Sequence, residues 1–367
     1  MTCEAKDDKL EALLSRAAGS VRALSVDEMA YLLSLNDPAD LSRLYAAARD
    51  VKLRCCGIGV SVRGLVESGN ICAKDCLYCG IRKSNANVKR YSLSADEIAD
   101  AAEEAKALGY ASLVVQSGEI ESEAHTSFIE DVLRRIAPLD LGVTLSLGEQ
   151  TEEVYRRWRE AGAERYLLRI ETSNPKLYAT LHPAECSWER RVECLRTLRR
   201  TGYQVGTGVM CALPGQTAVD LARDIAFYGD MDVDMIGMGP YIPHPDTPLA
   251  ATAPALSKAE RLQLGLKMIA VTRLYLHDVN IAAATALQAL ADNGREQGVM
   301  AGANVIMPNV TETRYRRSYQ LYEGKPCLDE QASLCRHCLE YRLKTIGEEL
   351  LFGRRGDSPH FHRRTHT

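Results

Sequence analysis

Three cysteines occur close together in the run Cys72-Ala-Lys-Asp-Cys76-Leu-Tyr-Cys79. Thiolates are the usual protein ligands of iron–sulfur clusters, and a cluster with a purely structural role normally has four of them. Three thiolates on one loop can hold three irons and leave the fourth iron open to another ligand. A zinc ion is the alternative, although tetrahedral structural zinc requires a fourth ligand nearby. The spacing therefore predicts a 4Fe–4S cluster with one open iron.

A second set of cysteines, Cys327, Cys335 and Cys338, lies near the C-terminal end of the sequence. Thiolates at these spacings could carry a second iron–sulfur cluster, of the 2Fe–2S or the 4Fe–4S type, with the fourth ligand from water or another residue. A zinc ion bound together with His337 or with a histidine of the tail is the alternative.

Composition narrows the class of protein. The chain has 367 residues, 46% of them hydrophobic, and a formal net charge of -4. Its charges are interspersed, so we expect no nucleic-acid surface, and no apolar run is long enough to predict a membrane span. The polar N-terminus predicts no signal peptide. Twelve cysteines without a secretion signal favour reduced thiols in the cytoplasm.

The pattern of apolar residues predicts three parts before a short tail. Residues 1–55 are predicted to form a helical extension, and residues 56–320 alternate short β-rich runs with helical patterns. Strands are predicted at Ile58–Val66, Ala111–Gln116, Gly142–Leu147, Arg165–Ile170, Gln204–Cys211, Met235–Gly239, Val279–Ala284 and Ala303–Met307. This alternation predicts an α/β fold, a parallel (β/α)8 TIM-type barrel, with an open doubly wound sheet as the alternative. Residues 321–352 follow as a C-terminal segment with the second cysteine set, and residues 353–367 as a mobile tail that contains His360, His362 and His366.

Polar side chains at the strand ends predict the position of a site, because the C-terminal ends of parallel barrel strands carry the active site. The second strand ends in Ser117-Gly118-Glu119. Thr144 and Ser146 alternate along the third strand and therefore face the same side. Arg169 and Glu171 follow on the fourth strand and are expected to point into the barrel mouth. An ion-pair layer with a structural role is the alternative for these last two residues.

The cysteine loop, with Tyr78 beside Cys79, resembles the cluster loop of the radical S-adenosylmethionine (SAM) superfamily. Ser117-Gly118-Glu119 is similar to the Gly-Gly-Glu element of that superfamily. Longer runs resemble the HydE family of FeFe-hydrogenase maturation enzymes, and the resemblance covers roughly residues 50–340. The runs are Leu77–Arg82 with Lys89–Tyr91, Tyr166–Arg169 with Glu171–Thr172, Leu213–Thr217, Gly239–Leu249 and Gly302–Asn309.

The resemblance implies an enzyme that binds SAM at the open iron and cleaves it with one electron to methionine and a 5′-deoxyadenosyl radical. It implies SAM contacts at Tyr78, Ser117, Gly118, Glu119, Ser146, Glu171 and Arg191. It also implies a substrate cavity lined by Thr144, Arg169, Thr285, Met307, Tyr319 and Tyr322. In that family the substrate is a small organometallic molecule, a cysteine-bound iron carbonyl cyanide complex, which leads to the diiron precursor of the hydrogenase H-cluster. Ferredoxin or flavodoxin as electron donor and the other hydrogenase maturases are the implied partners.

The sequence departs from the family pattern at three positions near the expected cavity. Leu147 stands where the family commonly has cysteine, Ile170 where it often has histidine, and Ala284 precedes Thr285 where a threonine pair is usual. A related radical SAM enzyme that acts on an amino acid or another small molecule, like methylornithine synthase or biotin synthase, is therefore an alternative. An iron–sulfur carrier is a further alternative, although a carrier needs neither Glu171 nor Arg191.

Overall fold

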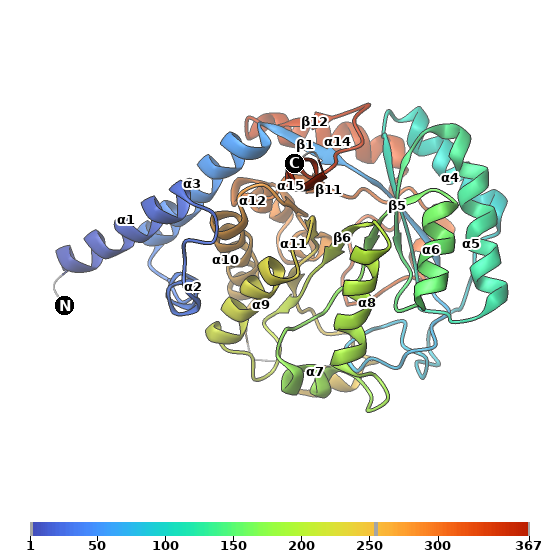
Figure 1. Ribbon diagram of the computed structural model, residues 1–367, viewed down its shortest axis with the longest axis horizontal. Coiled ribbons are helices and arrows are strands. Elements are labelled where there is room, and N and C mark those ends of the chain that lie inside the picture. Colours follow the sequence, from blue (N-terminus) through green and yellow to red (C-terminus); the bar gives the residue numbers. More distant parts are fainter. Residues whose placement is uncertain (1–2, 253–255, 366–367) are drawn as a thin grey trace.

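A parallel sheet of seven strands forms the centre of the computed structural model, which describes residues 3–252 and 256–365 (Figure 1). The strand order is β10-β8-β6-β5-β4-β3-β2. The strands are β2 (Gly64–Gly69), β3 (Ser112–Ser117), β4 (Gly142–Ser146), β5 (Ala163–Leu167), β6 (Gln204–Thr207), β8 (Met235–Ile236) and β10 (Asn280–Ile281). Nearly all of their residues are buried, as expected of a parallel sheet that is covered on both faces.

The sheet closes into a barrel through β11 (Val305–Ile306) and the residues that follow it. On the β10 side, the Ala283 N–H donates to Val305 O at 2.9 Å. On the β2 side, the Leu65 N–H donates to Pro308 O at 2.8 Å, and β1 (Gly59–Val62), which leads into β2, pairs with β11. Because both edges of the sheet are hydrogen-bonded, the predicted barrel is confirmed and the open-sheet alternative is wrong.

Helices surround this barrel, and several of them begin at a serine that caps the N-terminus. Ser94 and Ser257 each form a complete capping box with a glutamate three residues later. The main outer helices are α4 (Ala95–Ala107), α5 (Glu123–Ile136), α6 (Glu152–Glu160), α8 (Trp188–Arg200), α9 (Ala218–Asp230) and α10 (Lys258–Leu276), with the shorter α7 (Pro175–Leu181), α11 (Thr285–Leu290) and α12 (Gly294–Met300). Within the described ranges, no helix combines the length and the apolar composition that crossing a membrane requires.

An N-terminal helical layer projects from one side of the barrel in Figure 1. It consists of α1 (Cys3–Gly19), α2 (Val26–Leu33) and α3 (Pro38–Cys56). The apolar faces of α2 and α3 pack against α9 and α10, and the Lys52 ammonium on α3 forms a buried ion pair with Glu348. The pair fixes α3 to the C-terminal segment, which contains α14 (Ala332–Thr345) and β12 (Glu349–Leu351) and is preceded by the short α13 (Thr313–Arg316).

The C-terminal residues 353–365 differ from the mobile tail predicted for residues 353–367. They cross the N-terminal end of the barrel and end in α15 (Pro359–Thr365). Gly356 O accepts a hydrogen bond from Arg63 Nη2 at 3.0 Å, and Asp357 forms an ion pair with Arg165. Both arginines are buried inside the barrel and need acceptors there. The low apolar content of the tail gave no signal of this packing, because polar contacts hold the tail.

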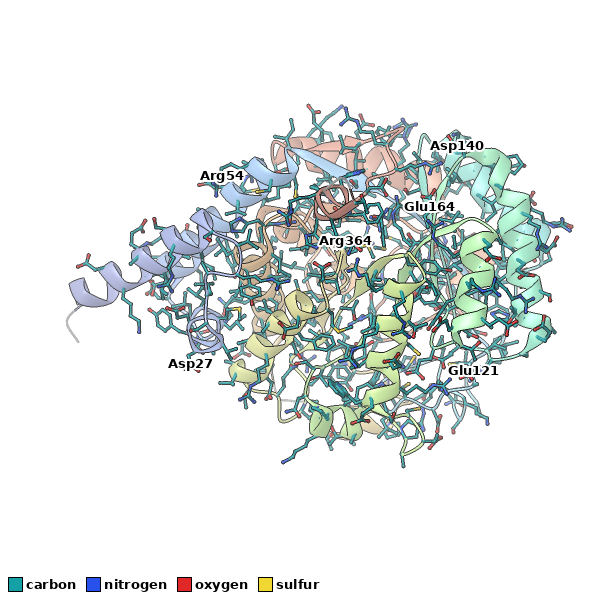
Figure 2. All side chains as sticks on the ribbon, viewed as in Figure 1. Asp27, Arg54, Glu121, Asp140, Glu164 and Arg364 are labelled. Atoms are coloured by element: carbon teal, nitrogen blue, oxygen red, sulfur yellow. The ribbon has the colours of Figure 1, made fainter. Side chains whose placement is uncertain are left out.

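The two ends of the barrel can be followed in Figure 2. Arg364 of α15 lies at the same end as Asp140 and Glu164, which both pair with Arg355 of the tail. Glu121, which pairs with Lys74 of the cysteine loop, lies towards the opposite end. The tail and the cysteine loop therefore cover opposite ends of the barrel.

His360 makes the stability of the tail dependent on pH. Its Nε2 lies 2.7 Å from an Asp232 oxygen and its Nδ1 lies 3.4 Å from an Asp278 oxygen. Hydrogen bonds to these carboxylates raise the pKa of His360 to about 9. The stabilisation is therefore complete below the unfolded pKa of about 6.5 and is lost as the pH rises through about 9.

We expect His360→Gln to lower the free energy of unfolding at about pH 6 and to change it little at about pH 10. Urea denaturation of both proteins at the two pH values measures this difference. An equal loss at both pH values would show that the histidine stabilises the tail by packing alone. The neighbouring His366 lies outside the described residues.

Candidate active site

A cavity of about 350 Å3 opens at the C-terminal ends of the barrel strands. The loop between β2 and α4 brings Cys72, Cys76 and Cys79 to its wall. Most of the other site residues predicted from the sequence lie on the same wall: Tyr78, Ser117, Glu119, Ser146, Arg169, Glu171, Arg191, Thr285, Met307, Tyr319 and Tyr322. Residues from several strand ends, from two loops and from α8 thus meet in one cavity.

The cysteine loop is fixed to the end of β3 by backbone contacts. The Ala73 N–H donates to Glu119 O at 2.7 Å, and the Glu119 N–H donates to Cys72 Sγ at 3.3 Å. Gly118 is not part of the cavity wall but permits this close approach, since a Cβ atom there would lie 2.2 Å from Ile71 O. The glycine at the end of the strand therefore determines where Cys72 is held.

The three thiols fit an iron–sulfur cluster with an open iron. Burial raises the pKa of Cys72 and Cys76, and raises that of Cys79 to about 12, so the free thiols stay protonated at neutral pH. A bound metal ionises coordinating thiols. Across the described part of the chain, the cavity wall contains no fourth cysteine, so a cluster held by these three thiols would have no cysteine ligand from this wall for its fourth iron.

A group of charged side chains adjoins the cysteine loop. Lys74 Nζ lies 3.0 Å from Glu119 Oε1 and 3.7 Å from Glu149 Oε2. Burial raises the pKa of Glu149, but the hydrogen bond and charge of Arg191 together with the charges of Lys74 and Arg190 outweigh this effect, and the pKa is lower than usual. Arg191 forms an ion pair with Glu149 and donates to Arg169 O at 2.7 Å. A fixed guanidinium and a carboxylate thus lie beside the predicted cluster, which suits a ligand with amino and carboxylate groups.

Glu171 lines the cavity and has a strained backbone conformation. Its φ is 65°, in the left-handed region, where a residue with a Cβ is strained by about 1–2 kcal/mol. Hydrogen bonds of its N–H to Gly208 O (3.0 Å) and of the Met210 N–H to its carbonyl (3.1 Å) hold it there. Burial raises the pKa of its carboxyl group, against the opposing charge of Arg169, whose Nη2 lies 3.0 Å from Glu171 Oε2. Strain of this kind is concentrated at functional sites.

Two residues that the sequence analysis assigned to a site, Thr144 and Cys338, lie outside that site in the structure. Thr144 points into the barrel as predicted, but it lines a separate small cavity with Arg165. It lies two residues before Ser146 on β4 and is therefore one layer deeper in the barrel.

The second cysteine set is also only partly assembled. The Sγ atoms of Cys327 and Cys335 and one carboxylate oxygen of Glu330 all lie within 4.8 Å of one another. Cys338 is exposed on α14, one turn after Cys335, and does not belong to that group. The third potential ligand in this group is therefore the carboxylate of Glu330, where the sequence analysis expected Cys338.

Three charged cavity residues were not predicted from the sequence. Lys74 lies inside the cysteine loop, so its position between two predicted ligands was an available signal. Glu67 and Lys325 form an ion pair on the cavity wall although 258 positions separate them, so no local pattern could reveal it.

A model of the radical SAM superfamily matches residues 66–228 of the chain. The [FeFe] hydrogenase maturase subunit HydE of Thermotoga maritima is 44% identical over 317 residues, which are 86% of this chain and 89% of that protein. The chain belongs to the HydE family of the radical SAM superfamily. It is therefore a radical SAM enzyme, and membership of this family implies a 4Fe–4S cluster and SAM as its cofactors.

More distant relatives of this HydE-family chain share its barrel. The 3-methylornithine synthase of Methanosarcina acetivorans is 27% identical over 285 residues, which are 77% of this chain and 79% of that protein. The crystal structure of methylornithine synthase (PylB) covers 93% of this chain and 98% of its own, with a TM-score of 0.79 and 23% identity. The FeFe-hydrogenase maturase HydG from Carboxydothermus hydrogenoformans covers 95% of this chain and 80% of its own, with a TM-score of 0.78 and 19% identity. These two structures support the fold.

Proposed function

We propose that this protein acts in FeFe-hydrogenase maturation as HydE does, by reductive cleavage of SAM inside the barrel. One observation carries the proposal: the identity with HydE of Thermotoga maritima is 44% and extends over 86% of the chain. The cavity supports it, because the cysteine loop and the polar strand ends enclose a single space of about 350 Å3.

The chemistry requires a shielded site. When bound, the cluster and SAM together supply a 5′-deoxyadenosyl radical, which attacks almost any nearby C–H bond. Cys72, Cys76 and Cys79 would hold three irons of that cluster. The C-terminal tail covers the N-terminal end of the barrel through Gly356 and Asp357, so solvent is excluded from that end. The protein thus contributes ligands, orientation and exclusion of water.

The residues beside the cysteine loop would hold SAM. The Arg191 guanidinium, fixed by Glu149, is suited to the SAM carboxylate. The buried Glu119 carboxylate lines the cavity beside Lys74, and it is suited to accept a hydrogen bond from the SAM ammonium group. Glu171 is suited to the ribose hydroxyls or the ammonium, because its carboxylate lines the cavity beside Arg169. Tyr78, Ser117 and Ser146 complete the wall on this side.

The substrate would occupy the remainder of the cavity as a small molecule or an organometallic complex. Arg169, Thr285, Met307, Tyr319 and Tyr322 line this part. Of the three departures from the family pattern, Leu147 and Ile170 are fully buried and lie outside the cavity wall, whereas Ala284 lies on it. Two departures therefore leave the cavity unchanged, which favours the HydE-like reaction.

A related radical SAM enzyme for an amino acid or another small molecule is the second candidate. Ala284 favours it, because the missing threonine hydroxyl changes the cavity wall itself.

We further propose ferredoxin or flavodoxin as electron donor, the other hydrogenase maturases as partners, and the cytoplasm as location. The cysteines from Cys55 to Cys338 are free thiols, which agrees with a reducing compartment.

Two anaerobic assays test the proposal. The protein reconstituted with iron and sulfide, and supplied with dithionite and SAM, is expected to produce 5′-deoxyadenosine. Added to a hydrogenase-maturation mixture that lacks only HydE, it is expected to restore hydrogenase activity. Formation of the nucleoside without restored hydrogenase activity would reject the maturase role and support the second candidate.

We also propose a second iron–sulfur cluster at Cys327 and Cys335, with Glu330 as a further ligand. The proximity of their ligand atoms supports it. We expect Cys335→Ala to lower the iron content to about four per chain while SAM cleavage stays largely intact, because the set lies outside the cavity wall. Iron analysis and the 5′-deoxyadenosine assay measure the two effects.

Cys338→Ala is the matched control for this set. The exposed Cys338 lies outside the group of ligand atoms, so its removal is expected to leave the iron content unchanged. A loss of iron equal to that of Cys335→Ala would mean that α14 presents Cys338 to the cluster instead of Glu330.

A further inference from the structure

One side chain, Arg90, joins the two ends of the cysteine loop. Its Nη1 donates hydrogen bonds to Asn70 O and to Ile81 O, each at 2.7 Å. Asn70 lies two residues before the first cysteine of the loop, and Ile81 lies two residues after the last. Nη2 donates to Arg82 O at 2.6 Å. A single guanidinium therefore holds the entry and the exit of the loop together, although it does not belong to the cavity wall.

Side-chain and backbone groups around Arg90 define its position. Asn70 Nδ2 donates to Lys89 O at 2.9 Å, and Asn70 Oδ1 accepts from the Tyr91 N–H at 2.8 Å. These two bonds bind the residues on either side of Arg90 to the entry of the loop. Arg90 Nη2 also donates to Asn85 O at 3.1 Å. The guanidinium is thus fixed relative to the loop by several independent contacts.

The positive charge of Arg90 has no carboxylate partner within residues 3–252 and 256–365. All of its hydrogen bonds go to backbone carbonyl oxygens. The other cations of the loop differ in this respect, because Arg82 is paired with Asp75 and Lys74 with Glu119. Carbonyl dipoles satisfy the N–H donors of a guanidinium but leave its charge uncancelled. Arg90 therefore contributes an uncompensated positive charge beside the loop.

This charge acts on two of the three cysteines. Burial raises the pKa of Cys72 and of Cys79, and the charge of Arg90 opposes that rise at both thiols. The attraction between a cation and an anion grows with the charge of the anion. An anionic group held by these thiols would therefore be stabilised by Arg90, and the stabilisation would increase with each negative charge that the group gains.

We propose that Arg90 is a positioning residue of the cluster site and that its charge raises the reduction potential of the cluster. One-electron reduction of a 4Fe–4S cluster adds one negative charge, and nearby charge is one of the factors that set its potential. Arg90 favours the reduced form and so makes it easier for a donor to supply the electron that SAM cleavage requires. The inference rests on the cluster of the proposed function and is independent of the identity of the substrate.

Two variants separate the charge of Arg90 from its hydrogen bonds. The reconstituted protein without SAM is titrated anaerobically at defined potentials, and the reduced cluster is measured by electron paramagnetic resonance. Arg90→Gln removes the charge but keeps an amide donor. We expect it to shift the equilibrium about tenfold or more towards the oxidised cluster, which corresponds to about 59 mV for one electron. Arg90→Lys keeps the charge, and we expect a shift of less than about threefold.

The positioning role has a separate measurement in the protein without iron. Both variants lose hydrogen bonds to carbonyl groups of the loop, so both are expected to unfold at a lower urea concentration than the parent protein. Lys83→Gln is the matched control, because Lys83 is an exposed cation of the same loop and water screens its charge. Its urea midpoint and its reduction potential are expected to stay near the parental values.

Three results would overturn the proposal. The first is a parental potential in Arg90→Gln, and the second is an equal shift in Arg90→Gln and Arg90→Lys, since hydrogen bonds rather than charge would then set the potential. The third is an unchanged urea midpoint in both variants, which would reject the positioning role. If Arg90→Gln retained no cluster, a tenfold shift in Arg90→Lys would still contradict the role of the charge. Formation of 5′-deoxyadenosine by the parent protein is measured separately, so failure of the proposed function is seen independently.

Discussion

Replacement of Cys76 by alanine is expected to reduce SAM cleavage to background. Cys76 lies on the cavity wall between Cys72 and Cys79, and the remaining two thiols cannot hold three irons of a 4Fe–4S cluster. Without a stable cluster, no electron reaches SAM. We therefore expect a complete loss of SAM cleavage. We also expect the iron content to fall by about four irons per chain. Anaerobic 5′-deoxyadenosine formation, iron content and visible absorbance measure the three effects.

Cys55→Ala provides the matched control for this variant. Cys55 is a half-buried free thiol on α3 and lies outside the cavity wall, so its removal should leave cluster and turnover intact. If Cys76→Ala kept its cluster and cleaved SAM, the ligands of the catalytic cluster would have to lie elsewhere.

The barrel could be predicted from the sequence because its signals are local. Ser94 and Ser257 carry capping boxes that the structure reproduces, and the apolar runs that became β3 and β4 are continuous and bounded by loops. The strands of the second half were harder to delimit. β8, β10 and β11 contain only two paired residues each, because the chain bends away at the barrel mouth to build the cavity wall.

The site could be predicted only where it is built from short motifs. Cys72, Cys76 and Cys79 share one loop, and Glu119 follows directly on a strand end. By contrast, alternation along β4 gave the correct face for Thr144 but not its depth. The ion pair of Glu67 and Lys325 depends on the path that the chain takes after the last barrel strand. The spacing of residues in the sequence does not predict this path.

Buried polar groups explain the two largest differences between prediction and structure. The tail after residue 352 has few apolar residues, so hydrophobic patterning favoured mobility, yet Arg63 and Arg165 at the barrel end require acceptors that Gly356 and Asp357 provide. Lys325 is likewise drawn to the cavity wall by Glu67 rather than by apolar contact. A charged side chain buried inside a barrel requires a partner, which a distant segment of the chain can provide. The pattern of apolar residues along the sequence does not indicate which segment this is.

Gly118→Ala is expected to impair cluster loading, although Gly118 has no side chain that could bind the cluster. A Cβ at this position would lie 2.2 Å from Ile71 O and 2.8 Å from Cys72 Cβ, both atoms of the chain that leads into the cysteine loop. Neither is the end of a flexible side chain, so the backbone of the loop must move. Overpacking of this kind costs about 1–3 kcal/mol in stability. A displacement of Cys72 by about 1 Å should lower the rate of SAM cleavage about a hundredfold.

Gly19→Ala isolates the effect of that contact from a glycine effect in general. A Cβ at Gly19, the last residue of α1, would meet no atom within 4 Å, so its stability and turnover should equal those of the parent protein or slightly exceed them. Iron content, urea denaturation and 5′-deoxyadenosine formation are compared in the two variants. Parental iron content and turnover in Gly118→Ala would show that the loop can move aside without cost. The end of β3 would then not determine the position of Cys72, and the backbone contacts of Ala73 and Glu119 would have to be sufficient to hold the loop.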